Sequence, residues 1–516
     1  MAMVLAKKNE RRARVTRQNG TTMAIDVMEV EVISTERIKP SSPTLAHLKT
    51  YNISLLDQLF PCAYVPLVFF YLNPQTTTSL TDLISERSHT LKQSLAQTLT
   101  SFYPFAGKIK DDLYVDCNDD GVYYVEARVN RYLLEILNQP DTRSTHRLLP
   151  QDPTLATARM NVVMIQVNFF ECGGIALSIC SSHKIIDGHT CTTFMKAWAR
   201  TAQGSSLAHP SFIASSLFPQ NCSLPKNSTL ILWPKMFNQI KYITKRFVFD
   251  ASALARIKAK ATSSSFVKNP SRIEALLGLI WKSAMAASKV RHGLQRHSVF
   301  SLAVNLRRKS SLPLSEFSVG NLIWSAVAQC TPDVDAAEEE LCCLVGRLRN
   351  AVKKINGDFV QELQEFHKVT KCLKELGEVY SNEGVDYFSC TSVCNGGMYE
   401  ADFGWGRPVW VSLGGAEDPL VMNLIFLMDT RSGGGIEAWV SLSEEEMDVF
   451  ERNSELLEFA LLDPSALELG NSTNCHALIY DRIGSIADVV LLVVRFDIAT
   501  LGSLSWCCGF PVPTVV

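Results

Sequence analysis

The sequence predicts a mixed α/β protein with two large domains. Its 516 residues exceed what one hydrophobic core usually serves, so two domains are the default expectation. In both halves of the chain, predicted strands alternate with stretches of helical period. Hydrophobic residues make up 47% of the chain and charged residues 20%, which is the ordinary composition of a well-packed globular protein.

The first half begins with a strand and a helix. Polar and apolar residues alternate at 29–34, as they do in a half-buried strand. Residues 88–102 predict a helix, because Leu91, Leu95 and Leu99 recur at helical spacing and Pro104 ends the run.

A hairpin is predicted in the middle of the chain. The β-rich run 162–170 and the apolar run 175–180 flank a turn, Glu171-Cys172-Gly173-Gly174. Residues 190–202 then predict a helix, with Phe194 and Trp198 on its apolar face. His183 therefore lies on the connection from a strand to a helix.

The second half repeats this alternation. Ser, Pro and Asn are frequent at 204–228, which makes this stretch the best candidate for an interdomain linker. A strand at 245–250 ends at a helix cap, and helices are predicted at 252–261 and 271–286.

Composition limits the partners and the metal chemistry. A net charge of −2 argues against a nucleic-acid partner. The 15 cysteines include no C-x-x-C pair, which favours reduced thiols in a cytosolic protein and gives little support to a structural zinc site. The apolar stretch 59–72 is short and interrupted by prolines, and the run 489–494 suits a buried strand, so no membrane span is expected.

His183 opens a hexapeptide, H-x-x-x-D-G, that ends at Gly188. At the end of a buried strand an imidazole can be held rigidly and still meet a substrate, so His183 is a candidate general base. The hexapeptide alone leaves a buried core histidine equally open. A metal site formed by His183, Asp187 and His189 lacks a further ligand cluster, and a serine hydrolase lacks its G-x-S-x-G elbow.

A second motif, D-F-G-W-G, occupies residues 402–406. Its first three letters match the magnesium motif of kinases, but no Gly-rich loop, V-A-I-K lysine or H-R-D loop accompanies them. A dinucleotide fingerprint would need a third glycine. Two glycines around Trp405 indicate a tight turn in which the backbone bends where side chains would clash.

Together the two motifs resemble those of the plant BAHD acyl-CoA-dependent acyltransferases. The resemblance covers residues 29–466 and is closest to the branch that contains vinorine synthase and salutaridinol acetyltransferase. Further matching segments are Ser42-Pro43-Thr44, Leu55-Leu56-Asp57, Phe102-Tyr103-Pro104-Phe105-Ala106-Gly107, Asn305-Leu306-Arg307, Met428-Asp429-Thr430-Arg431 and Gly435-Ile436-Glu437-Ala438-Trp439.

The resemblance implies two chloramphenicol-acetyltransferase-like α/β domains with a solvent channel between them. Acyl-CoA would enter one mouth and an alcohol the other, and they would meet at His183, the implied general base. Asp187 would point away from the substrate and pair with Arg307, which would fix the loop that ends at Gly188.

The second motif has a supporting role in this scheme. Its aspartate, Asp402, is counted with the catalytic residues in some descriptions of the family. Here Asp402, Gly404, Trp405 and Gly406 are expected to lie away from the reacting atoms and to shape the domain and its CoA side.

The implied chemistry suits these residues. An alcohol is a poor nucleophile at neutral pH, and an imidazole with a pKa of about 6.5 can remove its proton during attack on a thioester. No covalent enzyme intermediate is required. Acyl-CoA, with acetyl-CoA preferred, is expected as a co-substrate, with no permanently bound cofactor and no metal. Lys258 matches a CoA-contacting lysine of relatives, and a solvated helix face is the alternative.

Several positions depart from the family pattern. Ser392-Val393 stands where relatives have Ser-Trp, and Asn395 stands where they often have Arg; this region would line the acceptor pocket. Ser318-Val319-Gly320-Asn321 keeps only the last two letters of the family's Y-F-G-N. Ile186 and His189 are bulkier than the residues usual there.

These observations predict five segments: a basic leader at 1–28, an N-terminal acyltransferase domain at 29–203, a linker at 204–244, a C-terminal domain at 245–467, and an atypical tail at 468–516. The leader is expected to be disordered, with Met23 as an alternative start. No function is assigned to the tail.

The expected function is acetyl transfer from acetyl-CoA to a hydroxyl of an alkaloid or terpenoid plant metabolite, by a cytoplasmic monomer without a membrane partner. The alternatives are another acyl donor, hydroxycinnamoyl- or malonyl-CoA, an amine acceptor, or a catalytically silent binding protein.

Overall fold

The computed structural model describes residues 28–73, 79–151, 161–205, 209–224, 241–263, 267–309, 312–331, 340–380, 384–414 and 422–467. The leader before Met28, the tail after Leu467 and its apolar run at 489–494 lie outside the described residues. So do residues 225–240 of the expected linker.

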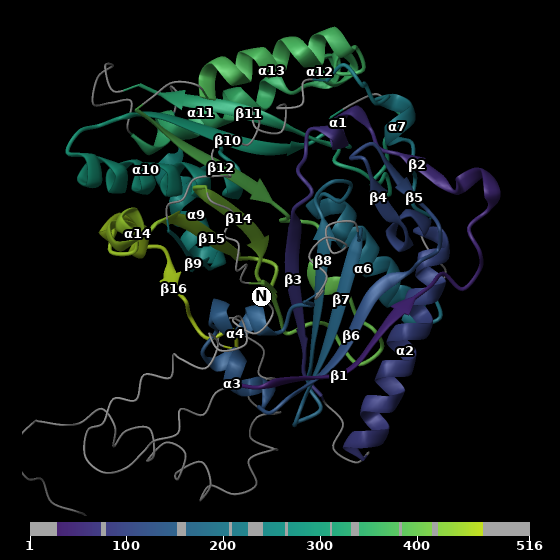
Figure 1. Ribbon diagram of the computed structural model, residues 1–516. Helices are drawn as coiled ribbons and strands as arrows, with labels where there is room; N and C mark the ends of the chain where they lie inside the picture. Colours follow the sequence, from purple (N-terminus) through teal and green to yellow (C-terminus); the bar gives the residue numbers. More distant parts are fainter. Residues whose placement is uncertain are drawn as a thin grey trace, which may run out of the picture.

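Two large mixed sheets organise the chain (Figure 1). The first has the order β1 (Val30–Ile38), β6 (Val122–Val129), β7 (Val163–Phe170), β8 (Ile175–Ser182), β3 (Tyr64–Tyr71) and β13 (Trp410–Leu413). The second has the order β11 (Ile323–Cys330), β10 (His297–Asn305), β12 (Val385–Ser392), β14 (Leu424–Asp429), β15 (Ile436–Ser443), β9 (Tyr242–Phe249) and β16 (Leu461–Leu462). A small third sheet joins β2 (Thr50–Asn52), β5 (Tyr114–Asp116) and β4 (Lys108–Lys110).

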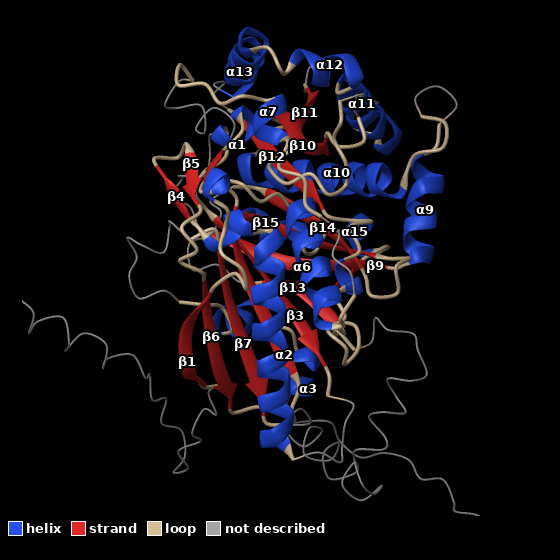
Figure 2. Cartoon of the chain, turned by 90° about the vertical axis from the view of Figure 1, so that its right-hand side faces the viewer, coloured by secondary structure: helices blue, strands red, loops and turns tan. Residues whose placement is uncertain are grey.

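Helices cover these sheets and bury their apolar sides. On the first sheet, α2 (Leu80–Ser101) and α6 (Gly188–Ala202) pack against each other in front of the strands (Figure 2). The longer helices beside the second sheet are α9 (Ala251–Ala261), α10 (Arg272–His292), α11 (Leu341–Lys354) and α13 (Phe366–Tyr380). Two short helices pack on the first core, α3 (Leu133–Asn138) and α4 (Thr142–Arg147). The other short helices are α1 (Leu55–Gln58), α7 (Ala214–Leu217), α12 (Gly357–Glu362), α14 (Glu444–Phe450) and α15 (Ser454–Leu457).

The mixed α/β prediction with two sheet-rich domains is confirmed. The predicted hairpin is β7 and β8, which pair antiparallel, and the helix predicted after His183 is α6. The predicted strand and cap before residue 251 are also present: β9 ends at Phe249, and the Asp250 carboxylate accepts a hydrogen bond from the Ala253 N–H at 2.7 Å.

Helix α2 begins at Leu80, eight residues earlier than predicted. Its first two turns hide the apolar pattern because they bury a polar residue, Arg87, which is only 3% exposed. The Arg87 guanidinium donates to the Gly173 carbonyl at 2.9 Å and to Asn73 at 3.0 Å, so its burial is compensated.

Each domain receives a segment from the other half of the chain. β13 joins the first sheet through antiparallel pairing with β3, although it lies more than 330 residues after it: Trp410 pairs with Phe70. Conversely, α1 and the following Leu59 and Phe60 are buried in the core of the second domain. This exchange brings residues from both halves to the end of β8.

None of the described helices combines the length and the apolar character that a membrane span requires.

Candidate active site

His183 lies directly after the last residue of β8. That strand pairs antiparallel with β3, where Ser182 faces Tyr64, and the His183 N–H extends the pairing by donating to the Ala63 carbonyl at 2.8 Å. The sheet thus fixes the main chain of the histidine, and its half-buried imidazole projects from the strand end. A rigid main chain with a partly buried side chain suits a proton-transfer residue.

Asp187 is directed at Arg307, as predicted, and both side chains are buried. The Arg307 guanidinium donates to the two carboxylate oxygens at 2.7 and 3.2 Å, and Asp187 also caps α6 by accepting from the Thr190 N–H at 2.7 Å. Burial alone would raise the pKa of Asp187, but the Arg307 charge and these hydrogen bonds hold it below its ordinary value. An ionised carboxylate occupied in this way anchors the loop.

Arg307 also ties the loop to the second domain. It donates to the carbonyls of Ser318 and Gly320 at 2.9 and 3.1 Å and to the Thr190 hydroxyl at 3.0 Å. His189 adds a contact of 2.8 Å between its Nε2 and the Glu316 carbonyl. The N-terminus of α6 is therefore held against residues 316–320.

Asn321 follows this segment and orients the imidazole. Its side-chain Nδ2 donates to the His183 carbonyl at 2.8 Å and to the Asp57 carboxylate at 3.0 Å, and both partners only accept. The amide oxygen must then face His183 Nδ1, which lies 3.0 Å away. An amide oxygen accepts, so Nδ1 carries the proton and the basic lone pair of the neutral ring is on Nε2.

Asp57 fixes Asn321 through hydrogen bonds. This fully buried carboxylate accepts from the Asn321 N–H at 2.7 Å and from the main chain and hydroxyl of Ser54 at 2.9 and 2.7 Å. Burial raises the pKa of Asp57, although these hydrogen bonds lower it in part. Asp57, Asn321 and His183 form a chain of hydrogen bonds that joins the two domains.

The imidazole is also flanked by an aromatic ring. Phe60 stacks on His183 with 4.8 Å between ring centroids and 15° between ring planes. Burial lowers the pKa of His183, and this effect exceeds the opposing effects of a main-chain hydrogen bond of His183 and of Asp187, Asn321 and Asp57. The ring is therefore neutral at physiological pH, as a general base must be.

The predicted acceptor-pocket residues lie near the start of α6. Ser392 ends β12, and a Cβ at Gly188 would come within 2.5 Å of Val393 Cγ1. Asn395 adopts a left-handed conformation, φ 61°, and accepts from Arg272 at 3.0 Å. Arg272 in turn pairs with Asp429 at 2.6 Å, which fixes this turn.

The D-F-G-W-G motif lies at the other end of α6. One Asp402 carboxylate oxygen accepts from the N–H groups of Gly404 and Gly406 at 2.8 and 3.0 Å, and both glycines have positive φ angles, 104° and 108°. The Asp402 carbonyl accepts from Gln203, which caps the C-terminus of α6. A helix of 15 residues spans roughly 22 Å, so the structure does not bring Asp402 to His183.

The predicted tight turn is present, but its glycines serve the positive φ angles and not a close contact: a Cβ at Gly404 would lie 4.0 Å from Gln203 Cγ, and one at Gly406 would meet no described atom within 4 Å. Trp405 packs beside this turn. It stacks on Phe403 at 5.7 Å and lies 5.3 Å from the Arg87 guanidinium, while Tyr71 donates to the Ala401 carbonyl at 2.8 Å. The motif thus connects the C-terminal half of the chain to α2 and β3.

Lys258 is a half-buried residue of α9, and its ammonium makes no ion pair with any described residue. No described contact connects it with the imidazole. In the described ranges, no group of three or more His, Cys, Asp or Glu side chains is placed to hold a metal ion.

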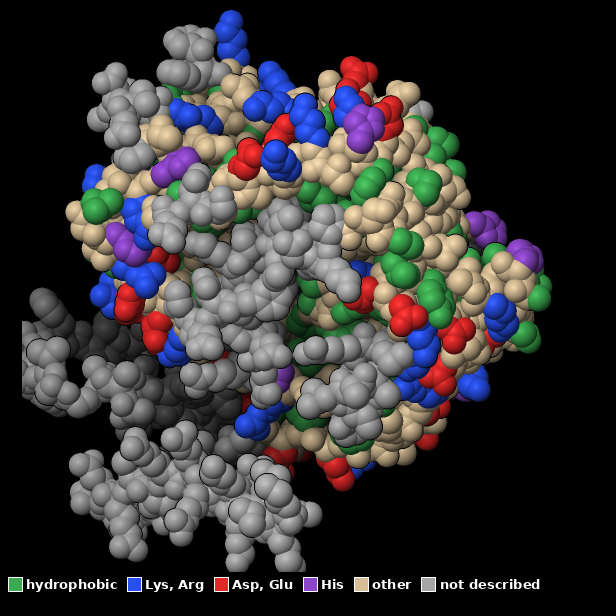
Figure 3. All heavy atoms as spheres, turned by 45° about the horizontal axis from the view of Figure 1, so that its top comes forward, with side chains coloured by type: hydrophobic (Ala, Val, Ile, Leu, Met, Phe, Trp, Pro, Cys, Tyr) green, Lys and Arg blue, Asp and Glu red, His purple; other side chains and the backbone are tan. Residues whose placement is uncertain are grey.

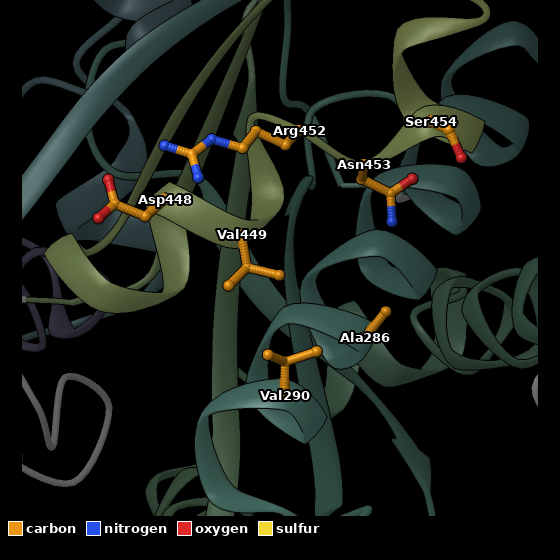
Figure 4. A pocket seen from close by; sticks show the side chains of 7 residues that line it. All are labelled: Ala286, Val290, Asp448, Val449, Arg452, Asn453 and Ser454. Atoms are coloured by element: carbon orange, nitrogen blue, oxygen red, sulfur yellow. The ribbon is translucent and has the colours of Figure 1, made fainter.

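A surface groove of about 480 Å³ lies on the second domain, away from all these residues (Figure 4). Its lining comes from α10 and from the segment around α14: Ala286, Val290, Asp448, Val449, Arg452, Asn453 and Ser454. None of the predicted site residues contributes to it.

Sequence reasoning gave no role to Asn321, Asp57 or Phe60. The first two stand in matched segments, Gly320-Asn321 and Leu55-Leu56-Asp57, and those matches were the available signal. No periodicity connects residues 57, 183 and 321, because their contact depends on the exchange of segments between the domains.

Comparison with known proteins agrees with the predicted family and fold. A family model described as the Transferase family matches residues 28–457. A limonoid 7-O-acetyltransferase of Citrus sinensis is 44% identical over 461 residues, covering 85% of this chain and 100% of the relative. Akuammiline synthase 2 of Alstonia scholaris is 36% identical over 455 residues, with 87% and 100% covered.

Solved structures share the same architecture. Vinorine synthase superposes with a TM-score of 0.73 at 32% identity, covering 85% of this chain and 100% of that one. A protein of F. sporotrichioides, complexed with coenzyme A and T-2, has a TM-score of 0.62 at 18% identity, with 80% and 99% covered. The chain belongs to the plant BAHD acyl-CoA-dependent acyltransferase family.

Proposed function

We propose that this acyltransferase moves an acetyl group from acetyl-CoA to a hydroxyl of a polycyclic terpenoid. The observation that carries the mechanism is the tautomer of His183, which places the basic lone pair on Nε2. The donor and the acceptor class are inferred from relatives, since a limonoid 7-O-acetyltransferase of Citrus sinensis and an epi-neemfruitin B 7-O-acetyltransferase of Melia azedarach are 44% and 42% identical to the chain.

In the proposed reaction, His183 Nε2 takes the proton of the acceptor hydroxyl as its oxygen attacks the thioester carbonyl. The oxyanion intermediate collapses, the carbon–sulfur bond breaks, and the imidazolium returns its proton to the CoA thiolate. Holding both substrates beside one imidazole supplies part of the rate through proximity. Asp187 and Arg307 would fix the loop.

The other predicted residues have supporting roles in this proposal. Asp402 and its glycines would stabilise the domain, Lys258 would contact CoA, and Ser392 and Asn395 would shape the acceptor side of a channel between domains 29–203 and 245–467. The protein would act as a cytosolic monomer without a nucleic-acid partner. Its interleaved charges of both signs support the last point (Figure 3).

An alkaloid acceptor is the second candidate. Stemmadenine O-acetyltransferase of Catharanthus roseus is 35% identical over 429 residues and covers 82% of the chain. Identity to the two 7-O-acetyltransferases, 44% and 42%, is higher.

The test follows CoA thiol release from acetyl-, malonyl- and hydroxycinnamoyl-CoA against a panel of limonoid and alkaloid alcohols. We expect release with acetyl-CoA and a limonoid alcohol, and a loss of about 10²- to 10⁴-fold in His183→Ala. His47→Ala, an exposed histidine on another surface, is the matched control. If no pair releases thiol, or if His183→Ala is as active as the wild type, the proposal is wrong.

A further inference from the structure

Lys184 follows the histidine in the hexapeptide and has no part in the reaction described so far. It is only 4% exposed, and its ammonium donates to the main-chain carbonyl of Phe60 with 3.0 Å between Nζ and the oxygen. Removing a lysine charge from water is unfavourable, and an apolar residue would fill this space at lower cost. The burial of this ammonium therefore indicates that its hydrogen bond has a role.

Phe60 is the residue whose ring lies flat on His183. Its carbonyl comes just past the end of α1, where main-chain carbonyls have no partner within the helix and need an outside donor when buried. Its N–H is already held by the Asp57 carbonyl at 3.1 Å. Lys184 thus completes the anchoring of this residue from the carbonyl side.

His183 and Lys184 both bind the short segment 60–63. The His183 N–H holds the Ala63 carbonyl at 2.8 Å, and the Lys184 ammonium holds the Phe60 carbonyl. Residues 60–63 are therefore fixed at both ends by the hexapeptide itself. The second of these contacts holds the main chain that carries the Phe60 ring.

The ring restrains a motion that Asn321 leaves possible. The hydrogen bond at Nδ1 holds one edge of the imidazole, and a tilt of the ring about that edge would move Nε2. A flat aromatic surface at 4.8 Å opposes such a tilt, which would otherwise carry Nε2 away from the acceptor hydroxyl.

We propose that Lys184 is a positioning residue for the general base: by holding the Phe60 carbonyl, it keeps the phenyl ring against the imidazole and so aims Nε2. This inference rests on the proposed role of His183. Lys184 touches neither substrate and transfers no proton in this scheme.

The experiment compares Lys184→Met, which keeps the length without a donor, with Lys184→Arg, which keeps charge and donor. Phe60→Leu removes the flat ring but keeps apolar bulk, and the double variant Lys184→Met/Phe60→Leu tests whether the two act together. Lys196→Met, on α6 and paired with Glu400 at the surface, is the control. The readouts are kcat and KM with acetyl-CoA and the most rapidly acetylated alcohol of the panel.

We expect kcat to fall about ten- to a hundredfold in Lys184→Met and in Phe60→Leu, with little change in KM, because a small displacement of a catalytic group has effects of this size. The double variant should lose no more than the worse single variant, and Lys184→Arg should recover most of the rate. Multiplying losses, a rise in KM alone, or an unchanged kcat in Phe60→Leu would each overturn the proposal. The last result does so even if Lys184→Met does not fold.

A second readout does not depend on activity. In protein labelled with ¹³C at histidine Cε1, the His183 signal, assigned from its loss in His183→Ala, should shift in Lys184→Met and stay unchanged in Lys196→Met. An unshifted signal contradicts the positioning role. A shifted signal without thiol release from any substrate pair would instead place the failure in the proposed function.

Discussion

Asn321 decides the protonation pattern of His183 because its amide can be oriented in only one way. Two acceptors, the His183 carbonyl and the Asp57 carboxylate, occupy its NH₂ group and leave the oxygen for Nδ1. The buried carboxylate Asp187 is turned to Arg307 and takes no part in this pattern. The imidazole is therefore aligned by the neutral amide of Asn321, and the Asp57 carboxylate contacts that amide and not the ring.

Replacing Asn321 by leucine should reduce catalysis and move its pH dependence. Loss of one hydrogen bond to the imidazolium, worth about 1.5–3 kcal/mol, corresponds to a fall of about 10- to 150-fold in kcat/KM. Burial already lowers the pKa of His183, so the acidic limb of the wild-type profile should lie below about 6.5. Because Asn321 favours the charged ring, the limb should lie lower still in Asn321→Leu.

The check is kcat/KM measured from pH 5 to 8 for both proteins, with Asn118→Leu on an exposed loop as the control. A wild-type limb above pH 7, or a limb in Asn321→Leu that moves upward, would contradict the assignment of His183 as the titrating base. Unfolding curves at each pH separate a loss of protein from a loss of rate.

At the scale of elements, the start of α6 depends on a close approach. A methyl group on Gly188 would meet Val393 Cγ1 at 2.5 Å, closer than atoms can pack, and a β-branched side chain has little freedom to move aside. Gly188→Ala should therefore displace the turn after β12 or the helix start, destabilise the fold by about 1–3 kcal/mol and lower kcat.

The matched experiment is the double variant Gly188→Ala/Val393→Ala, which provides the missing space. Thermal unfolding and thiol release should recover most of the loss relative to Gly188→Ala, after subtraction of the effect of Val393→Ala alone. If the two losses simply add, the contact is not what the glycine serves.

Local patterns were sufficient for elements whose apolar faces are unbroken. β7 and β8 were predicted as apolar runs on either side of a turn and are buried along their whole length, and β9 was predicted as a strand that ends at a helix cap. α6 was predicted from the helical spacing of its apolar residues. The start of α2 was missed, since Arg87 occupies a buried position. The local sequence could not show where β13 and α1 lie, because each packs in the domain formed mainly by the other half of the chain. The predicted site therefore did not include Asp57, Phe60 and Asn321, which meet His183 only through this exchange.

At the scale of the whole molecule, a buried ion pair lies where the two domains meet. Arg246 of β9 and Glu437 of β15 are each 1% exposed and 3.1 Å apart. Glu437 also accepts from the indole of Trp410, which belongs to the first sheet, and Arg246 lies 5.0 Å from the same ring. Arg246 further donates to the Pro464 carbonyl. Two residues later, the Ala466 N–H donates to the Leu137 carbonyl of α3, so this segment also contacts the first domain.

Removing one partner of this pair should lower the free energy of unfolding more than removing both. Arg246→Met leaves a buried carboxylate without its countercharge, which typically costs about 3–5 kcal/mol of unfolding free energy, whereas Arg246→Met/Glu437→Leu removes both charges and should recover much of the loss. Burial already raises the pKa of Glu437 despite the arginine, so without Arg246 the pKa should rise further. A carboxyl group with a raised pKa in the folded state binds more protons than in the unfolded state, so its penalty grows as pH rises from the unfolded-state pKa to the folded-state pKa and is complete above it. Denaturant unfolding at pH 5 and pH 8 should therefore show Arg246→Met closer to the wild type at pH 5. Equal penalties at both pH values, or a double variant weaker than Arg246→Met, would show that this pair does not hold the domains together.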